Sequence, residues 1–80
     1  MRIVDRIISI LVNVKDSIDY QHENHLMSDG KLESIDIVNI ITELEENFEI
    51  EIGYEYITKE NFESVEAILK MVEKIKNGGA

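Results

Sequence analysis

Residues 34–48, SIDIVNIITELEENF, form the stretch of sequence that decides the fold. Counted from Ile37, the apolar side chains recur at offsets of three, four, seven and eleven residues, the spacing of one face of an α-helix. The residues on this face are Ile37, Ile40, Ile41, Leu44 and Phe48. Ile35 and Val38 fall off the face, so we expect them to be partly exposed near the start of an amphipathic helix that spans residues 34–48.

Two further segments, one on each side, show the same helical spacing. The first predicted helix spans residues 2–14, with an apolar stripe of Ile3, Ile7, Leu11 and Val14, widened by Val4, Ile8 and Ile10. The last spans residues 64–76, with a predicted buried stripe of Val65, Ile68, Leu69, Val72 and Ile75. Ser64 is a favourable N-cap for this last helix, and lysines near its end suit the helix dipole.

The segments between these helices differ in character. Residues 15–33 are rich in turn-forming residues and make a connection longer than most loops in compact domains. We expect three apolar side chains to anchor it, namely Ile18, Leu26 and Leu32. Residues 49–63 are too broken for a full helix, but Thr58 can cap one turn, which predicts a short helix between residues 56 and 62.

These elements together predict an all-α fold. It is a small four-helix bundle with three main helices, one short helix and a long first loop. A chain of 80 residues supports one hydrophobic core, so we assign residues 1–77 to a single domain and residues 78–80 to a flexible C-terminal tail. We expect the bulky branched side chains of the stripes to fill the core.

Composition restricts the kinds of partner. The chain has 17 acidic and 8 basic residues and a net charge of −9, which repels nucleic acids and anionic lipid headgroups and attracts basic protein surfaces. Cysteine is absent, which excludes disulfides and thiolate chemistry. We expect a monomeric cytoplasmic protein that binds no nucleic acid and does not insert into membranes. Its small size argues against an enzyme.

One serine stands where the long loop meets the central helix. Residues 30–36, GKLESID, place the hydroxyl of Ser34 at a helix N-terminus between acidic neighbours. The unpaired backbone N–H groups and the helix dipole at such a position favour a phosphate group. Within this segment alone, an N-cap is the commoner role of such a serine.

This segment resembles the attachment motif of the acyl carrier protein family, which reads Asp-Ser-Leu at the start of the second helix. Here it reads Glu33-Ser34-Ile35. The resemblance extends to Asp36, Val38, Leu44-Glu45-Glu46, Phe48, Glu51-Ile52 and Ser64-Val65, and it covers essentially the whole chain. It implies the four-helix fold predicted above, and it raises the attachment role of Ser34 above the cap.

The resemblance also implies a function. Ser34 would accept a 4′-phosphopantetheine arm from coenzyme A, and the thiol of this arm would hold an acyl or aminoacyl cargo as a thioester. The protein itself would be non-catalytic. Its partners would be a phosphopantetheinyl transferase, an acyl or aminoacyl ligase and acyl-transferring enzymes with basic surfaces. The residues that match docking positions of the family are Glu33, Ile35, Asp36, Val38, Glu45 and Glu46.

Three residues depart from the fatty-acid carriers of that family. Asn39 and Thr42 stand in place of Glu and Met on the docking face, and Gly53 stands in place of Pro. The chain is more similar to stand-alone carriers of specialised pathways, including D-alanyl carriers for cell-envelope modification. We therefore expect a short acyl or aminoacyl cargo rather than a growing fatty acid. An unmodified helical adaptor with the same fold is the alternative.

Two metal-binding interpretations are weaker. Asp29-Gly30 resembles the turn of a calcium-binding EF-hand, but the first and third ligand positions would then be His25 and Met27. His22 and His25 are three residues apart without a third ligand of suitable spacing. We therefore predict no metal site.

Overall fold

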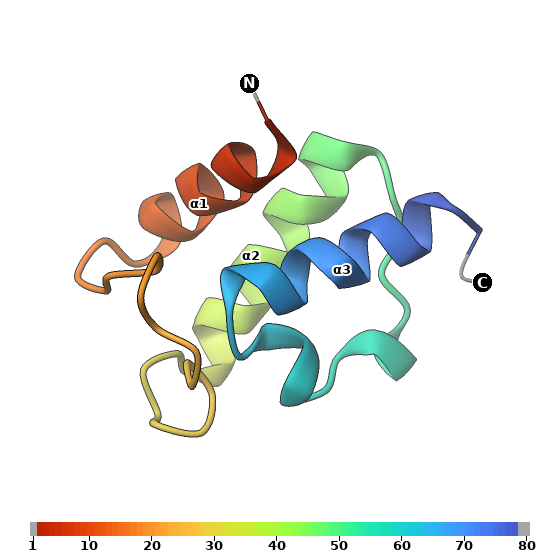
Figure 1. Cartoon of the computed structure of the whole chain (residues 1–80). Coiled ribbons are helices and arrows are strands. Elements are labelled where there is room, and N and C mark those ends of the chain that lie inside the picture. Colours follow the sequence, from red (N-terminus) through yellow and green to blue (C-terminus); the bar gives the residue numbers. More distant parts are fainter. Residues whose placement is uncertain (1, 79–80) are drawn as a thin grey trace.

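The computed structural model describes residues 2–78. Its elements are α1 (Ile3–Val14), α2 (Ser34–Phe48), the 3-10 turns η1 (Tyr54–Tyr56) and η2 (Glu60–Phe62), and α3 (Val65–Lys76). No strand occurs within residues 2–78, so the described part of the chain is all-helical. Figure 1 shows α1 and α3 lying in front of α2. Of the predicted C-terminal tail, residues 79–80 lie outside the described residues.

The short helix expected between residues 56 and 62 is replaced by the two 3-10 turns. Ile57 separates them, with a backbone (φ −86°, ψ 76°) that no helix can continue through. The side-chain amide of Asn61 donates to the Tyr56 carbonyl at 2.7 Å, which holds the two turns together. Lys59 occupies the N-cap position of the second turn, and Thr58, the predicted cap, lies one residue earlier, where its Oγ1 accepts from the Asn61 N–H at 3.3 Å. The described fold therefore has three α-helices rather than four.

One continuous core joins the three helices. Its buried helical residues are Ile7, Ile10, Leu11, Ile37, Ile40, Leu44, Phe48, Val65, Ile68, Met71 and Val72. The connecting segments add Tyr20, Leu26, Leu32, Ile52 and Phe62. Complete burial of one such apolar side chain contributes about 1.5–3 kcal/mol to the stability of the fold. The connecting segments therefore stabilise this small core, as the helices do.

The apolar stripe of α3 is rotated from the one predicted. Met71 is buried, whereas Leu69, which we expected to be buried, is only half-buried. Ile68 is fully buried; at about 100° per residue, Leu69 points about 100° away from it and Met71 about 60° away on the other side. Both residues border the apolar stripe of α3, and the packing of α3 against its neighbours buries Met71 rather than Leu69.

Tyr20 anchors the first loop together with two of the three predicted residues. Leu26 and Leu32 lie in the core, while Ile18 is half-buried. The Tyr20 ring is also in the core, and its hydroxyl donates to the Lys15 carbonyl at 2.5 Å and lies 3.2 Å from the Leu11 carbonyl. The loop is thus fastened to the last turn of α1.

Arg6 of α1 fastens the far end of α2. Its guanidinium lies 4.5 Å above the Phe48 ring, a cation–π contact. Its Nη2 donates to the Asn47 carbonyl at 2.6 Å. A cation at a helix C-terminus also interacts favourably with the negative end of the helix dipole. Among the described residues, no helix is both long enough and apolar enough to cross a lipid bilayer.

Candidate functional site

Ser34 is the first residue of α2 and is exposed. Glu33, in an extended conformation (φ −98°, ψ 169°), occupies the N-cap position instead. Asp36 Oδ2 accepts from the Glu33 N–H at 2.9 Å, which is half of a capping-box arrangement. The helix start is therefore organised by the two acidic neighbours, and the Ser34 hydroxyl does not serve as the cap.

Lys15 ties these acidic neighbours to the end of α1. Its Nζ lies 3.5 Å from Asp36 Oδ2 and 4.0 Å from Glu33 Oε2. The Asp36 side chain is only 14% exposed, whereas that of Glu33 is 72% exposed. Exposed ion pairs contribute little, so the Lys15–Asp36 pair is the one that matters for the position of the helix start.

Part of the predicted docking set shares one outward face of α2. Ile35 and Val38 are 62% and 56% exposed, as the sequence pattern predicted. Glu46, three turns after Ile35, lies on the same face at an offset of eleven residues and is also exposed. Glu33 is exposed just before the helix. This face combines an apolar centre with an acidic end at Glu46, and Glu33 lies beside its start.

The other two predicted docking residues have intramolecular hydrogen bonds. Asp36 lies about 100° around the helix from Ile35 and is directed towards Lys15. Glu45 is half-buried, and its Oε2 accepts from the Ile52 N–H at 2.9 Å. Glu45 thereby holds the chain that leaves α2, so the structure places Asp36 and Glu45 on the flanks of the outward face.

An apolar depression of about 290 Å³ opens beside Ser34. Its lining residues are Met27, Ser34, Ile37, Val38, Ile41 and Ile57. It opens at the surface, where Ser34, Val38 and Ile57 are exposed. Two of the lining residues, Met27 and Ile57, belong to connecting segments. The positions of these segments cannot be predicted from helical spacing.

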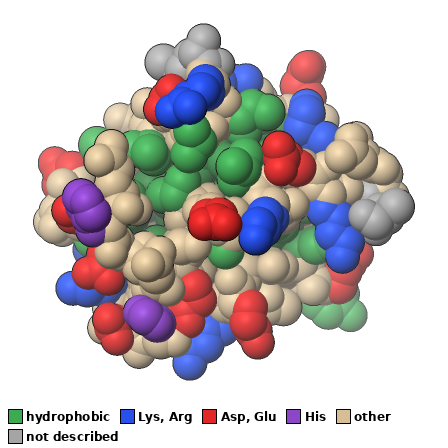
Figure 2. Space-filling view, in the orientation of Figure 1, with side chains coloured by type: hydrophobic (Ala, Val, Ile, Leu, Met, Phe, Trp, Pro, Cys, Tyr) green, Lys and Arg blue, Asp and Glu red, His purple; other side chains and the backbone are tan. Residues whose placement is uncertain are grey.

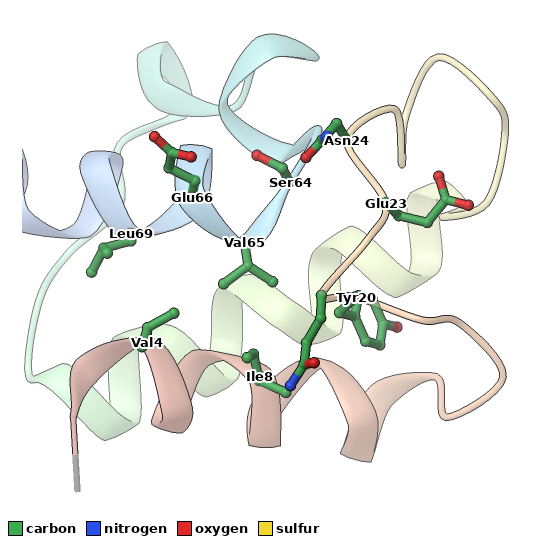
Figure 3. A pocket seen from close by; sticks show the side chains of 10 residues that line it. Val4, Ile8, Tyr20, Glu23, Asn24, Ser64, Val65, Glu66 and Leu69 are labelled. Atoms are coloured by element: carbon green, nitrogen blue, oxygen red, sulfur yellow. The ribbon is translucent and has the colours of Figure 1, made fainter.

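A second depression, of about 340 Å³, lies between α1, the first loop and the start of α3. Figure 3 shows Val4 and Ile8 facing it from α1, and Val65 and Leu69 from α3. Hydrophobic side chains gather on this side of the molecule in Figure 2. Ser64 also lines the depression, but its Oγ caps α3 by accepting from the Ala67 N–H at 3.0 Å. Ser34 does not line it.

Neither metal-binding interpretation gains a ligand set from the structure. Within residues 2–78, no group of three or more acidic or histidine side chains is arranged to hold a metal ion. His22 Nδ1 instead lies 2.7 Å from Asp19 Oδ2. Gly30 adopts a left-handed conformation (φ 68°) and closes a turn in which the Asp29 N–H donates to the His25 carbonyl.

Comparison of the chain with protein-family models gives no match. No curated protein matches it either. No solved structure matches it.

Proposed function

We propose that this protein is a non-catalytic carrier that acts after a 4′-phosphopantetheine group from coenzyme A is attached to Ser34. One observation carries the proposal: an exposed serine begins α2, a different residue caps the helix, and an apolar depression adjoins it. The resemblance of Glu33-Ser34-Ile35 to the acyl carrier motif supports the same assignment.

The surroundings of Ser34 fit a phosphodiester. The hydroxyl is exposed and can be reached by a transferase. The backbone N–H groups of Ser34 and Ile35, in the first turn of α2, have no partner in the helix backbone, whereas that of Glu33 is paired with Asp36. The positive end of the helix dipole lies at the same position and favours an anion. In attachment, Ser34 Oγ would bond to the phosphorus next to the pantetheine, lose its proton, and displace adenosine 3′,5′-bisphosphate. When bound, the group supplies a thiol that holds cargo as a thioester.

The outward face of α2 is the proposed docking surface for partner enzymes. Ile35 and Val38 would supply the apolar contact, while Glu33 and Glu46 would attract basic residues of the transferase, ligase or acyl-transferring enzyme. Rim charges mainly raise the association rate, and a small apolar centre supplies affinity. Asp36 and Glu45 would contribute at the flanks, within the limits that their own hydrogen bonds set.

The depression beside Ser34 favours a short acyl cargo. Its volume, about 290 Å³, lies just below the range of small-molecule sites, roughly 300–1,000 Å³. Apart from Ser34, every lining residue is apolar. An alanyl ammonium group would lose its hydration there without gaining a partner. A D-alanyl cargo remains the alternative, with the amino acid left in solvent.

Intact-mass measurement tests the assignment. After incubation with coenzyme A, Mg²⁺ and a broad-specificity phosphopantetheinyl transferase, the wild type should gain the mass of one phosphopantetheinyl group. Ser34→Ala should gain nothing, while Ser17→Ala, which alters an exposed serine of the first loop, should behave as the wild type. An unmodified wild type, or a modified Ser34→Ala, would refute the carrier function and leave the unmodified adaptor.

A further inference from the structure

Glu63, between η2 and α3, binds a segment of the first loop that lies 35–37 residues earlier in the chain. Its Oε1 accepts from the N–H groups of Met27 and Ser28 at 2.8 and 2.9 Å. Its Oε2 accepts from the Ser28 hydroxyl, and its backbone carbonyl accepts from the Leu26 N–H at 2.9 Å. One residue thus receives three consecutive backbone N–H groups and a hydroxyl.

The bound segment is the start of a tight turn that leads to Ser34. Lys31 and Leu32 donate their N–H groups to the Leu26 carbonyl at 2.9 and 3.2 Å, and Gly30 donates to the Met27 carbonyl at 3.1 Å. The later N–H groups of the turn are therefore paired within it, whereas the early ones are paired with Glu63. The turn has no regular element of its own to hold its entrance in place.

The same segment supplies one wall of the depression beside Ser34. The Met27 side chain lines it, opposite residues of α2 and the residue Ile57 between the two 3-10 turns. The Met27 N–H donates to Glu63 Oε1, so the carboxylate contacts the backbone of the residue that forms this wall. Ser28 hydrogen bonds also lower the pKa of Glu63, as expected for a carboxylate whose charged form accepts several donors.

We propose that Glu63 is a positioning residue for the depression beside Ser34: its carboxylate holds residues 26–28 so that Met27 closes one side. That this depression takes the cargo rests on the proposed function, whereas the position of Met27 does not. Glu63 does not line the depression itself, so it acts through the loop.

The test uses the full, unmodified chain and two substitutions. Glu63→Ala removes both side-chain acceptors, and Glu63→Gln keeps one uncharged acceptor oxygen. Glu60→Gln is the matched control, because it removes the same charge from an exposed residue of η2. Amide hydrogen exchange and the Met27 methyl NMR signal are measured for each protein, with the amides of α1, α2 and α3 as internal references.

In Glu63→Ala, exchange of the Met27 and Ser28 amides should become at least about tenfold faster, as expected when charge-assisted hydrogen bonds are lost. The Met27 methyl signal should shift towards its random-coil position. Glu63→Gln should fall between the wild type and Glu63→Ala, and Glu60→Gln should match the wild type. The α2 amides should keep their exchange rates in all four proteins.

Three results would overturn the proposal: an unchanged Met27 methyl signal in Glu63→Ala, unchanged exchange at both loop amides, or a uniform acceleration through all helices. The last would show that Glu63 merely stabilises the fold. Since none of these measurements requires the phosphopantetheine arm, they can fail while the mass experiment on Ser34 succeeds, and the reverse. When the wild type is modified and loaded with a butyryl group, the methyl signals of Val38 and Ile57 should shift. The same loading of the Glu63→Gln variant should give smaller shifts.

Discussion

The substitution Tyr20→Phe removes the hydroxyl that fastens the first loop to α1 and leaves the buried ring in place. The Leu11 carbonyl still accepts from the Lys15 N–H at 2.8 Å, so mainly the Lys15 carbonyl loses its donor. We expect a loss of about 1 kcal/mol at neutral pH, the net contribution of a typical hydrogen bond. In a domain of this size such a loss lowers Tm by about 4–8 °C.

The same hydroxyl predicts a dependence on alkaline pH. Burial, and then the negative charges of Asp36 and Asp16, raise the pKa of Tyr20 to about 12 from the ordinary value of 10.0. Because the folded pKa is the higher one, the stabilisation is complete below about pH 10 and is lost as the pH rises towards 12. At about 1.4 kcal/mol per pKa unit, the full loss approaches roughly 2.7 kcal/mol.

Urea denaturation of both proteins from pH 7 to pH 12 measures this effect, because the other ionisations are shared and cancel in the difference. The wild type should be about 1 kcal/mol more stable than Tyr20→Phe at pH 7, equally stable at about pH 10.7, and about 1 kcal/mol less stable at pH 12. Tyr54→Phe is the control, since Tyr54 is 87% exposed. A Tyr20→Phe difference that stays constant over this pH range would refute the buried, hydrogen-bonded hydroxyl.

Three further predictions concern docking, cargo and the start of α3. Glu46→Lys should slow phosphopantetheinyl transfer severalfold at low salt and much less at high salt, with an unchanged circular dichroism spectrum; equal rates at every ionic strength would mean that this face is only solvated. Butyryl loading should shift the methyl NMR signals of Val38 and Ile57, and alanyl loading should not; equal shifts with both would contradict the preference for a short acyl group. Ser64→Ala should lower the free energy of unfolding by about 1 kcal/mol in urea, because the Ala67 N–H loses its cap; no loss would show that the cap is not needed.

Local pattern was sufficient to place the main helices. The predicted ranges 2–14, 34–48 and 64–76 correspond to Ile3–Val14, Ser34–Phe48 and Val65–Lys76. Helical periodicity and capping residues act within one or two turns of the chain, so these features can be recognised without any knowledge of the packing. The hydrogen bond of Thr58 at the start of η2 is a local feature of the same kind.

Local sequence pattern did not predict the structure where two local conformations are about equally compatible with the same residues. Residues 56–62 could form one short helix or, as observed with η1 and η2, 3-10 turns separated at Ile57. Likewise, either Leu69 or Met71 could complete the stripe of α3. In both cases the preference within the segment is weak, and contacts with other segments select the outcome.

The candidate site also has a part that the sequence predicts and a part that it does not. The sequence by itself determined that Ser34 begins a helix between acidic residues, and that Ile35 and Val38 point away from the core. Only the tertiary structure brought Met27 and Ile57 together beside Ser34 and set Glu63 against the loop. Helical spacing reports relations between residues a few positions apart. Contacts between segments thirty or more residues apart depend on how all three helices pack, and no local pattern contains that information.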